Sequence, residues 1–222
     1  MTVRAAAVIP AFNEVITVGE VVEVALQAAL IDEVVVVDNA STDGTAAAAV
    51  KAGARLETCV QPGKGQAMAA GVAATDAPVI VFLDADLVGL VPGHVDRLAE
   101  AVLSGRAGMA CGLFDRGPVL NRLFLRVLPI LTGQRGLRRE IFEGLHDKDQ
   151  RGWRIEAALN SRCKELSAPV EAFVCDGLWH RTKEEKYPSA VEGFVRKQGM
   201  LITAVAAYAG YRIRKARRAR RR

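Results

Sequence analysis

The sequence lacks most of the patterns that would place it outside ordinary globular proteins. Its 222 residues contain four cysteines, with no CxxC pair and no histidine at a zinc-binding spacing from them. We therefore expect reduced cysteines and a cytoplasmic protein. No apolar run approaches the roughly 20 residues that span a bilayer. The N-terminus also lacks the charged-then-apolar layout of a signal peptide.

The common phosphate-binding and nucleophile motifs are absent too. No GxGxxG follows a predicted strand, which argues against a dinucleotide-binding domain of the Rossmann type. The segment around Lys64 lacks the following Ser or Thr and the earlier Gly of a P-loop. There is no GxSxG, so the nucleophile elbow of the α/β-hydrolases is excluded.

The excess of positive charge is confined to one end of the chain. Eight of the 30 Lys and Arg residues lie in 212–222, which contains no acid, so 22 basic residues face 25 acidic ones elsewhere. A body with a net charge of −3 disfavours binding of nucleic acid. The apolar stretch 200–209 followed by this tail would suit an anionic membrane surface. The alternative is a helix packed on the body, with a disordered, solubilising end.

Strand and helix patterns alternate, which predicts an α/β fold with a mostly parallel central sheet flanked by helices. The predicted strands cover residues 5–9, 33–38, 54–60, 78–83, 107–113 and 168–175. The predicted helices cover residues 14–30, 45–52, 65–74, 92–104, 119–131, 136–145, 155–166 and 188–211. We expect a single domain over residues 1–187, followed by a C-terminal helix and basic tail over 188–222.

Four polar clusters fall where predicted strands end, at residues 10–14, 38–44, 62–65 and 84–86. Each alone is compatible with an ordinary turn, but ligands bind beyond the carboxyl ends of parallel strands. The pair Asp84 and Asp86 follows a run of apolar residues that delivers two carboxylates to this edge. Such a pair suits Mg²⁺ or Mn²⁺ with phosphate oxygens completing the shell. The alternative is a turn cap beside an exposed acid.

These four segments resemble the ordered motifs of glycosyltransferase family 2 enzymes, which have the GT-A fold. The matching stretches are Val8-Ile-Pro-Ala-Phe-Asn-Glu14, Val35-Val-Val-Asp-Asn-Ala-Ser-Thr-Asp-Gly-Thr45, Gly63-Lys-Gly65 and Phe82-Leu-Asp-Ala-Asp86. The resemblance implies a hexosyltransferase that uses a nucleotide-sugar donor, a UDP- or GDP-sugar, with Mg²⁺ or Mn²⁺.

The resemblance also assigns roles to residues. Three residues of the first motif would line the nucleoside site: Pro10, Phe12 and Glu14. Asp38 would hydrogen-bond the base, and Lys64 would lie near the nucleotide. Asp84 would contact the ribose or sugar, and Asp86 would ligate the metal between the diphosphate oxygens.

The second half resembles the polyprenyl-phosphate sugar transferases, of the dolichol-phosphate mannose synthase type. Residues 131–142 are similar to their Thr-Ser-Gly-Phe-Arg segment, although Gln134 replaces the aromatic residue. Arg135, Arg138 and Arg139 are then candidate phosphate contacts, because a guanidinium grips phosphate in two places. For these arginines, the alternative is a solvated helix face.

Two further residues complete the predicted site. His180, in Trp179-His180-Arg181, resembles the third metal ligand of other GT-A enzymes, including glucosyl-3-phosphoglycerate synthases. Glu156 is the candidate catalytic base, with Asp147 or Asp149 in reserve. The alternatives are a surface histidine and an acid that pairs with a basic neighbour on its helix.

The predicted reaction transfers a sugar to an acceptor, and the first hypothesis is a polyprenyl phosphate at the inner membrane surface. The second is a small soluble acceptor such as phosphoglycerate. The third is a catalytically inactive nucleotide-sugar-binding protein. A homodimer and an anionic membrane surface are the other partners considered, and nucleic acid is not expected.

Overall fold

The protein is seen here as a computed structural model, which describes residues 3–118, 121, 132–146, 149 and 154–180. The first part of the chain alternates strand and helix: β1 (Ala5–Ala11), α1 (Val18–Gln27), β2 (Glu33–Asp38), α2 (Thr45–Lys51), β3 (Arg55–Thr58), α3 (Lys64–Ala73) and β4 (Val79–Phe82). The later elements are β5 (Leu87–Val88), α4 (Pro92–Leu103), β6 (Met109–Phe114), β7 (Arg135–Arg138), α6 (Arg139–Glu143), α7 (Arg154–Glu165), β8 (Val170–Cys175) and β9 (Trp179–His180). The predicted helix over 119–131 lies outside the described residues, apart from residue 121, as do the predicted boundary at 187 and everything after it.

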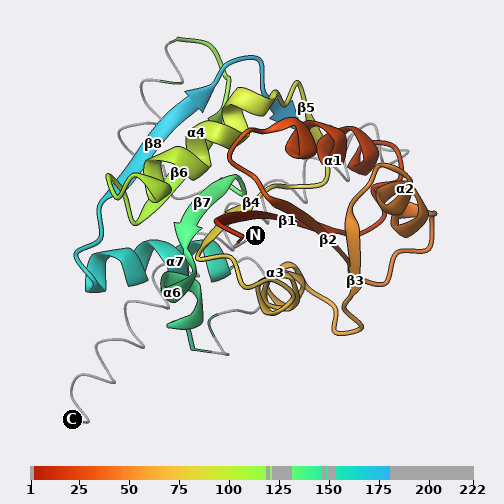
Figure 1. Cartoon of the computed structure of the whole chain (residues 1–222), viewed down its shortest axis with the longest axis horizontal. Coiled ribbons are helices and arrows are strands. Elements are labelled where there is room, and N and C mark those ends of the chain that lie inside the picture. The colour runs from red at the N-terminus through yellow and green to blue at the C-terminus, as the bar shows by residue number, and fades with distance from the viewer. Residues whose placement is uncertain (1–2, 119–120, 122–131, 147–148, 150–153, 181–222) are drawn as a thin grey trace, which may run out of the picture.

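One seven-stranded sheet forms the centre of the molecule, in the order β3-β2-β1-β4-β7-β6-β8 (Figure 1). Strands β1 to β4 are parallel to one another, and β6 is parallel to β8. Strand β7 runs antiparallel to both of its neighbours, β4 and β6. Strands β4 and β6 therefore point the same way, and the carboxyl ends of β1, β2, β4 and β6 share one edge. This confirms the predicted α/β fold with a mostly parallel sheet.

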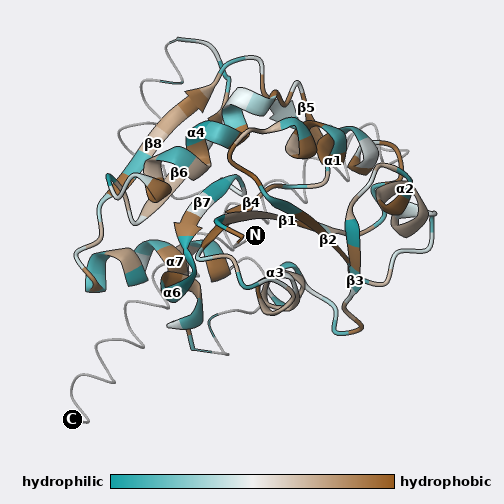
Figure 2. Cartoon of the chain, in the orientation of Figure 1, coloured by the Kyte–Doolittle hydropathy of each residue, from teal (hydrophilic) through white to brown (hydrophobic). Residues whose placement is uncertain are grey.

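Helices cover both faces of the sheet, with α1, α2 and α4 on one side and α3, α6 and α7 on the other (Figure 1). The buried strand β2 shows why its sequence does not alternate. Val34 and Val36 pack with the first set of helices, and Val35 and Val37 with the second. In Figure 2 the central strands β1 and β2 are hydrophobic, whereas α4 and α7 are mixed in colour.

The predicted helix over residues 136–145 is wrong in its first part. Strand β7 occupies that part, and only α6 is helical. Leu137 and Ile141 recur at helical spacing, which favoured the prediction. The strand pairs with β4 and β6, and Gly136 lets it lie against α4, because a Cβ there would collide with the Leu98 carbonyl oxygen. Glycine thus lets α4 pack directly on β7 and extend the sheet.

The expected contact with a membrane surface depends on residues 200–222, which the structure does not describe. None of the helices it does describe has the length and apolar character that crossing a bilayer requires. The membrane contact stays a prediction.

Candidate active site at the carboxyl edge of the sheet

The loops that follow β2 and β3 are joined through Asn39. Its Nδ2 donates hydrogen bonds to the carbonyl oxygens of Cys59 and Gln61, both at 2.8 Å. Its Oδ1 accepts one from the backbone N–H of Gly63, also at 2.8 Å. Asn39 is 8% exposed, so a buried amide fixes the second and third predicted clusters against each other.

The loop after β1 is held against the loop after β2. The backbone N–H of Asn13 donates to Ser41 Oγ at 3.0 Å, and that of Glu14 donates to Thr45 Oγ1 at 2.8 Å. These bonds keep the loop out of a helix, so α1 begins at Val18 rather than at the predicted Glu14. The first and second clusters therefore lie together, as predicted.

Asp38 provides a buried acid at this edge. Asp38 is only 8% exposed, and its Oδ1 has no hydrogen-bond partner within the part of the chain that the structure describes. An unsatisfied buried acceptor costs about 1–3 kcal/mol, so this oxygen is suited to an N–H from a ligand. On the neighbouring strand, Pro10 pairs with Val37, and the Phe12 side chain that follows is 59% exposed.

Lys64, Asp84 and Glu156 form an ion cluster from three separate elements. Lys64 Nζ lies 2.8 Å from Asp84 Oδ1 and 3.1 Å from Glu156 Oε1. The three side chains are only 19%, 24% and 9% exposed, respectively. Burial disfavours the ammonium, but the two carboxylates outweigh it and raise the pKa of Lys64 above its ordinary value. Of the two reserve acids, Asp149 is buried and Asp147 lies outside the described residues.

Asp84 is also held from the side of β7, by residues that the motif search did not assign. Gln134 Nε2 donates to Asp84 Oδ2 at 2.9 Å, and Thr132 Oγ1 lies 2.7 Å from Gln134 Oε1. Thr132 and Gln134 are 2% and 1% exposed. The available signal was the departure of Gln134 from the aromatic residue of the family pattern.

The short ribbon of β5 and β9 brings Asp86 and His180 to the same place. Leu87, which directly follows Asp86, pairs with His180 in this antiparallel ribbon. The His180 ring lies on Phe114, with 4.9 Å between ring centroids. Over the described ranges, no three His, Cys, Asp or Glu side chains gather into a group that could hold a metal by themselves.

Arg116 is a cation of this edge that sequence reasoning missed. It follows the carboxyl end of β6, and its Cζ lies 5.9 Å from the centroid of the Phe114 ring. Phe114 also contacts His180, so Arg116 and the β5–β9 ribbon lie next to the same aromatic ring. The rule that ligands gather beyond parallel strands could have found it, since residues 107–113 were predicted as a strand.

The structure corrects the expectation that Arg135 reaches a phosphate at the surface. Strand β7 directs this side chain inward, where it is 0% exposed. Its Nε donates to the carbonyl oxygen of Thr132 at 2.8 Å, and Nη1 points to Met109 Sδ at 3.5 Å. The guanidinium is held inside the protein, where it braces the turn into β7.

Arg138 and Arg139 are displaced from the site because β7 runs away from the carboxyl edge. Arg138 pairs with Val79, the first residue of β4. Arg139 donates to the carbonyl oxygens of Ala77 and Val72, at 2.8 Å and 3.0 Å. Arg139 thus satisfies carbonyl groups near the end of α3, which is a structural role rather than a phosphate contact.

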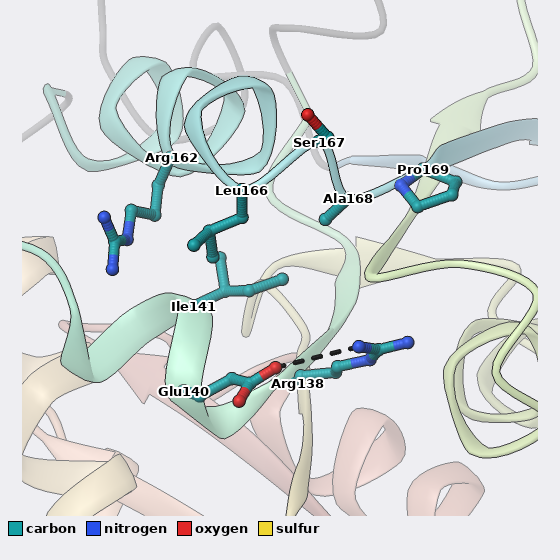
Figure 3. Close-up of a pocket in the computed structure, with 8 residues that line it drawn as sticks. All are labelled: Arg138, Glu140, Ile141, Arg162, Leu166, Ser167, Ala168 and Pro169. Atoms are coloured by element: carbon teal, nitrogen blue, oxygen red, sulfur yellow. Dashed lines mark ion pairs between the residues drawn. The ribbon is translucent and has the colours of Figure 1, made fainter.

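A pocket of about 330 Å³ lies near this opposite edge, between α6, the end of α7 and the start of β8 (Figure 3). Ile141 and Leu166 point toward each other at its centre, between Arg162 and the pair formed by Arg138 and Glu140. Apart from Arg138, none of the described residues predicted for the site lines this pocket.

Comparison with known sequences gives two results. The sequence model of glycosyl transferase family 2 matches residues 6–163. The glucosyl-3-phosphoglycerate synthase of Mycobacterium tuberculosis (strain ATCC 25618 / H37Rv) is 36% identical over 122 residues, which make up 50% of this chain and 38% of that enzyme. Its counterpart in Mycolicibacterium smegmatis is 41% identical over 107 residues, or 44% of this chain and 35% of that one. The match therefore spans less than two fifths of the length of these curated relatives.

Solved structures of the M. tuberculosis synthase are similar over most of the chain. The complex with Mg²⁺ and UDP has a TM-score of 0.69 and 28% identity, covering 81% of this chain and 72% of that one. A complex with Mn²⁺, UDP-glucose and phosphoglyceric acid has a TM-score of 0.76 and 26% identity, covering 94% and 79%. These relatives are not polyprenyl-phosphate sugar transferases, so they correct the narrower resemblance predicted from residues 131–142.

Proposed function

Because the chain belongs to glycosyl transferase family 2, we propose that it transfers a glucosyl group from UDP-glucose to a small phosphorylated acceptor of the phosphoglycerate type, with Mn²⁺ or Mg²⁺. One observation carries the proposal. The buried acid Asp38, the Lys64 ion cluster and the Asp86–His180 ribbon share the carboxyl edge of one sheet. The complexes of the synthase with UDP-glucose and phosphoglyceric acid support this choice of donor and acceptor.

Recognition of the base is assigned to Asp38. Its buried Oδ1 would accept the N3–H of uracil, which removes the cost of leaving that oxygen unsatisfied. The exposed ring of Phe12 and the neighbouring Pro10 and Glu14 would form the rest of the nucleoside site. Guanine also offers N–H donors, and the relatives' UDP complexes favour uracil.

The residues at the ribbon fit a divalent metal ion. A carboxylate from Asp86 and an imidazole from His180 are ligand types that Mn²⁺ accepts, and the diphosphate of the donor supplies further oxygens. When bound, the ion neutralises the negative charge that develops on the departing UDP. The tilted contact between the His180 and Phe114 rings would limit the rotation of the imidazole.

The remaining charged residues position the donor and handle the proton. Lys64, kept as an ammonium by its two carboxylates, would offer its charge to the diphosphate. Asp84 would accept a hydrogen bond from a ribose or sugar hydroxyl. In the reaction the bond from the anomeric carbon to the diphosphate oxygen breaks, and one to the acceptor oxygen forms. The acceptor's proton passes to Glu156 if attack is from the opposite face, or to the departing phosphate oxygen if it is from the same face.

The acceptor's anionic groups are assigned to Arg116. This residue is exposed and follows β6, which is separated in the sheet by β1, β4 and β7 from β2, the strand that carries Asp38. A guanidinium binds phosphate or carboxylate by paired hydrogen bonds, which an acceptor of the phosphoglycerate type provides. The buried position of Arg135 leaves Arg116 as the better placed of these two arginines.

The proposal is tested by measuring sugar transfer with purified protein. UDP-, GDP- and dTDP-glucose are each offered with 3-phosphoglycerate and, in separate reactions, with a polyprenyl phosphate, in Mn²⁺ or in EDTA. We expect transfer from UDP-glucose to 3-phosphoglycerate that requires the metal and is lost in Asp86→Ala. The exposed Asp76→Ala serves as the control that keeps activity. Transfer to the polyprenyl phosphate alone would restore the first acceptor hypothesis, and activity in EDTA would refute the metal's role.

A further inference from the structure

The carboxylate of Asp84 is gripped from two directions. Lys64 Nζ lies 2.8 Å from Oδ1, and Gln134 Nε2 lies 2.9 Å from Oδ2. We propose that Gln134, anchored by Thr132, is a positioning residue that holds Asp84 oriented toward the donor. The proposal rests on the function proposed above, because it concerns how the donor-binding carboxylate is kept in place.

The amide of Gln134 has one satisfactory orientation. With Nε2 toward Asp84, an N–H donor faces a carboxylate, while Oε1 lies 2.7 Å from the Thr132 hydroxyl. The Thr132 hydroxyl also contacts the carbonyl oxygen of Gly112 in β6, so its proton lies between two acceptors. Turning the amide over would place its oxygen against the Asp84 carboxylate, which is repulsive. The chain Thr132–Gln134–Asp84 is therefore ordered and buried at its inner end.

The backbone between Thr132 and Gln134 also lies close to the Asp84 carboxylate. A Cβ at Gly133 would overlap both oxygens of Asp84, so only glycine allows the loop to come this near. The consequence is a clamp, made of Thr132, Gly133 and Gln134, that covers Asp84 from the side of β7. The carboxylate has little freedom to turn within it.

Asp84 needs a second partner because its ion pair with Lys64 competes with other anions for the same ammonium. Lys64 is shared between Asp84 and Glu156, and a donor diphosphate would draw on the same ammonium. The buried Gln134 amide is neutral, so the diphosphate does not attract it away from its hydrogen bond with Asp84. We expect Gln134 to keep the Asp84 carboxylate in position when Lys64 turns to the donor.

The functional test is a double-mutant cycle between Gln134 and Asp84. Gln134→Met has a similar volume and lacks the hydrogen bonds, and should raise the KM for UDP-glucose about tenfold, as expected for a lost bond to a charged group. In an Asp84→Ala background the same change should have no further effect, because Gln134 acts through Asp84. Equal effects in both backgrounds would overturn the proposal. The exposed Gln27→Met, at the end of α1, is the matched control with unchanged kinetics.

A second pair of variants guards against misfolding. Thr132→Val removes the hydroxyl that anchors the amide, whereas Thr132→Ser keeps it. We expect Thr132→Val to raise the KM for UDP-glucose several-fold and Thr132→Ser to have a KM like that of the wild type. In both variants kcat should change less than KM. A KM that follows side-chain volume instead of the hydroxyl would contradict the clamp.

A measurement without donor separates this inference from the proposed function. The same Gln134–Asp84 cycle is read from thermal unfolding of the free protein, where a direct contact predicts non-additive shifts in Tm. If the wild type binds no UDP-glucose but the shifts are non-additive, the function fails and the contact stands. If the shifts add, the contact itself is refuted, whatever the activity.

Discussion

Replacing Lys64 with methionine should destabilise the protein and impair donor use together. The change leaves the Asp84 and Glu156 carboxylates facing each other without the cation between them. Breaking a buried ion pair costs about 3–5 kcal/mol, whereas exposed pairs contribute about 0–1 kcal/mol. The three side chains are 9–24% exposed, so we expect a loss of about 2–3 kcal/mol, or roughly 5–10 °C in Tm.

The pH dependence of this loss has a definite sign. The folded-state pKa of Lys64 is raised, so its stabilising contribution is complete below the ordinary lysine value of about 10.4 and disappears only above it. The stability difference between wild type and Lys64→Met should therefore be constant from about pH 6 to pH 9.

The assay is chemical or thermal unfolding across this pH range, combined with steady-state kinetics for UDP-glucose. Lys51→Met is the control, because Lys51 is exposed in the last turn of α2 and should change stability by less than about 0.5 kcal/mol. We expect kcat/KM for UDP-glucose to fall about 100-fold in Lys64→Met alone. A Tm within 2 °C of wild type, at about the precision of the measurement, would refute the assignment of Lys64 as the central charge of the cluster.

Three further predictions concern other parts of the molecule. Asp38→Asn should weaken UDP binding about tenfold by calorimetry, because a neutral acceptor forms a weaker hydrogen bond with the base; unchanged affinity would remove Asp38 from base recognition. Arg116→Met should raise the KM for 3-phosphoglycerate about tenfold and leave that for UDP-glucose unchanged; equal rises would contradict its role on the acceptor side. Gly71→Ala should cost about 1–3 kcal/mol in chemical unfolding, because a Cβ would press on Val8 below the sheet, while Gly93→Ala, which meets nothing within 4 Å, should not destabilise the protein.

The fold could be predicted where the hydrophobic pattern of the sequence matches the burial that the residues have in the structure. The run Val34–Val37 is apolar on both faces, and β2 occupies the residues predicted for it. The polar clusters were predicted to lie together because parallel strands end at one edge. The Asn13 backbone N–H indeed donates to Ser41 in the loop after β2, and Asn39 Nδ2 donates to Cys59 in the loop after β3. These inferences need only the period of the sequence and the direction of the strands.

The part that could not be predicted depends on contacts between distant segments. The strand at Arg135–Arg138 pairs with β4 and β6 and lies against α4 at Gly136, and no local pattern reports these contacts. Arg135 was predicted to contact a phosphate, whereas the strand turns its side chain into the core. Gln134 stood out only as a departure from a family motif, and its bond to Asp84 required the three-dimensional structure. The roles of Glu156 and His180 stay predictions, although both lie near the expected partners.

Strand β7 has a consequence for how the chain is made. Until it emerges from the ribosome, β4 is the open border of a four-stranded sheet, and its residues Val79–Phe82 are entirely apolar. An uncovered apolar border of this kind is a template for pairing with other chains. About fifty residues of synthesis separate β4 from the strand that covers it. Nascent chains halted in that interval should be the most prone to aggregate.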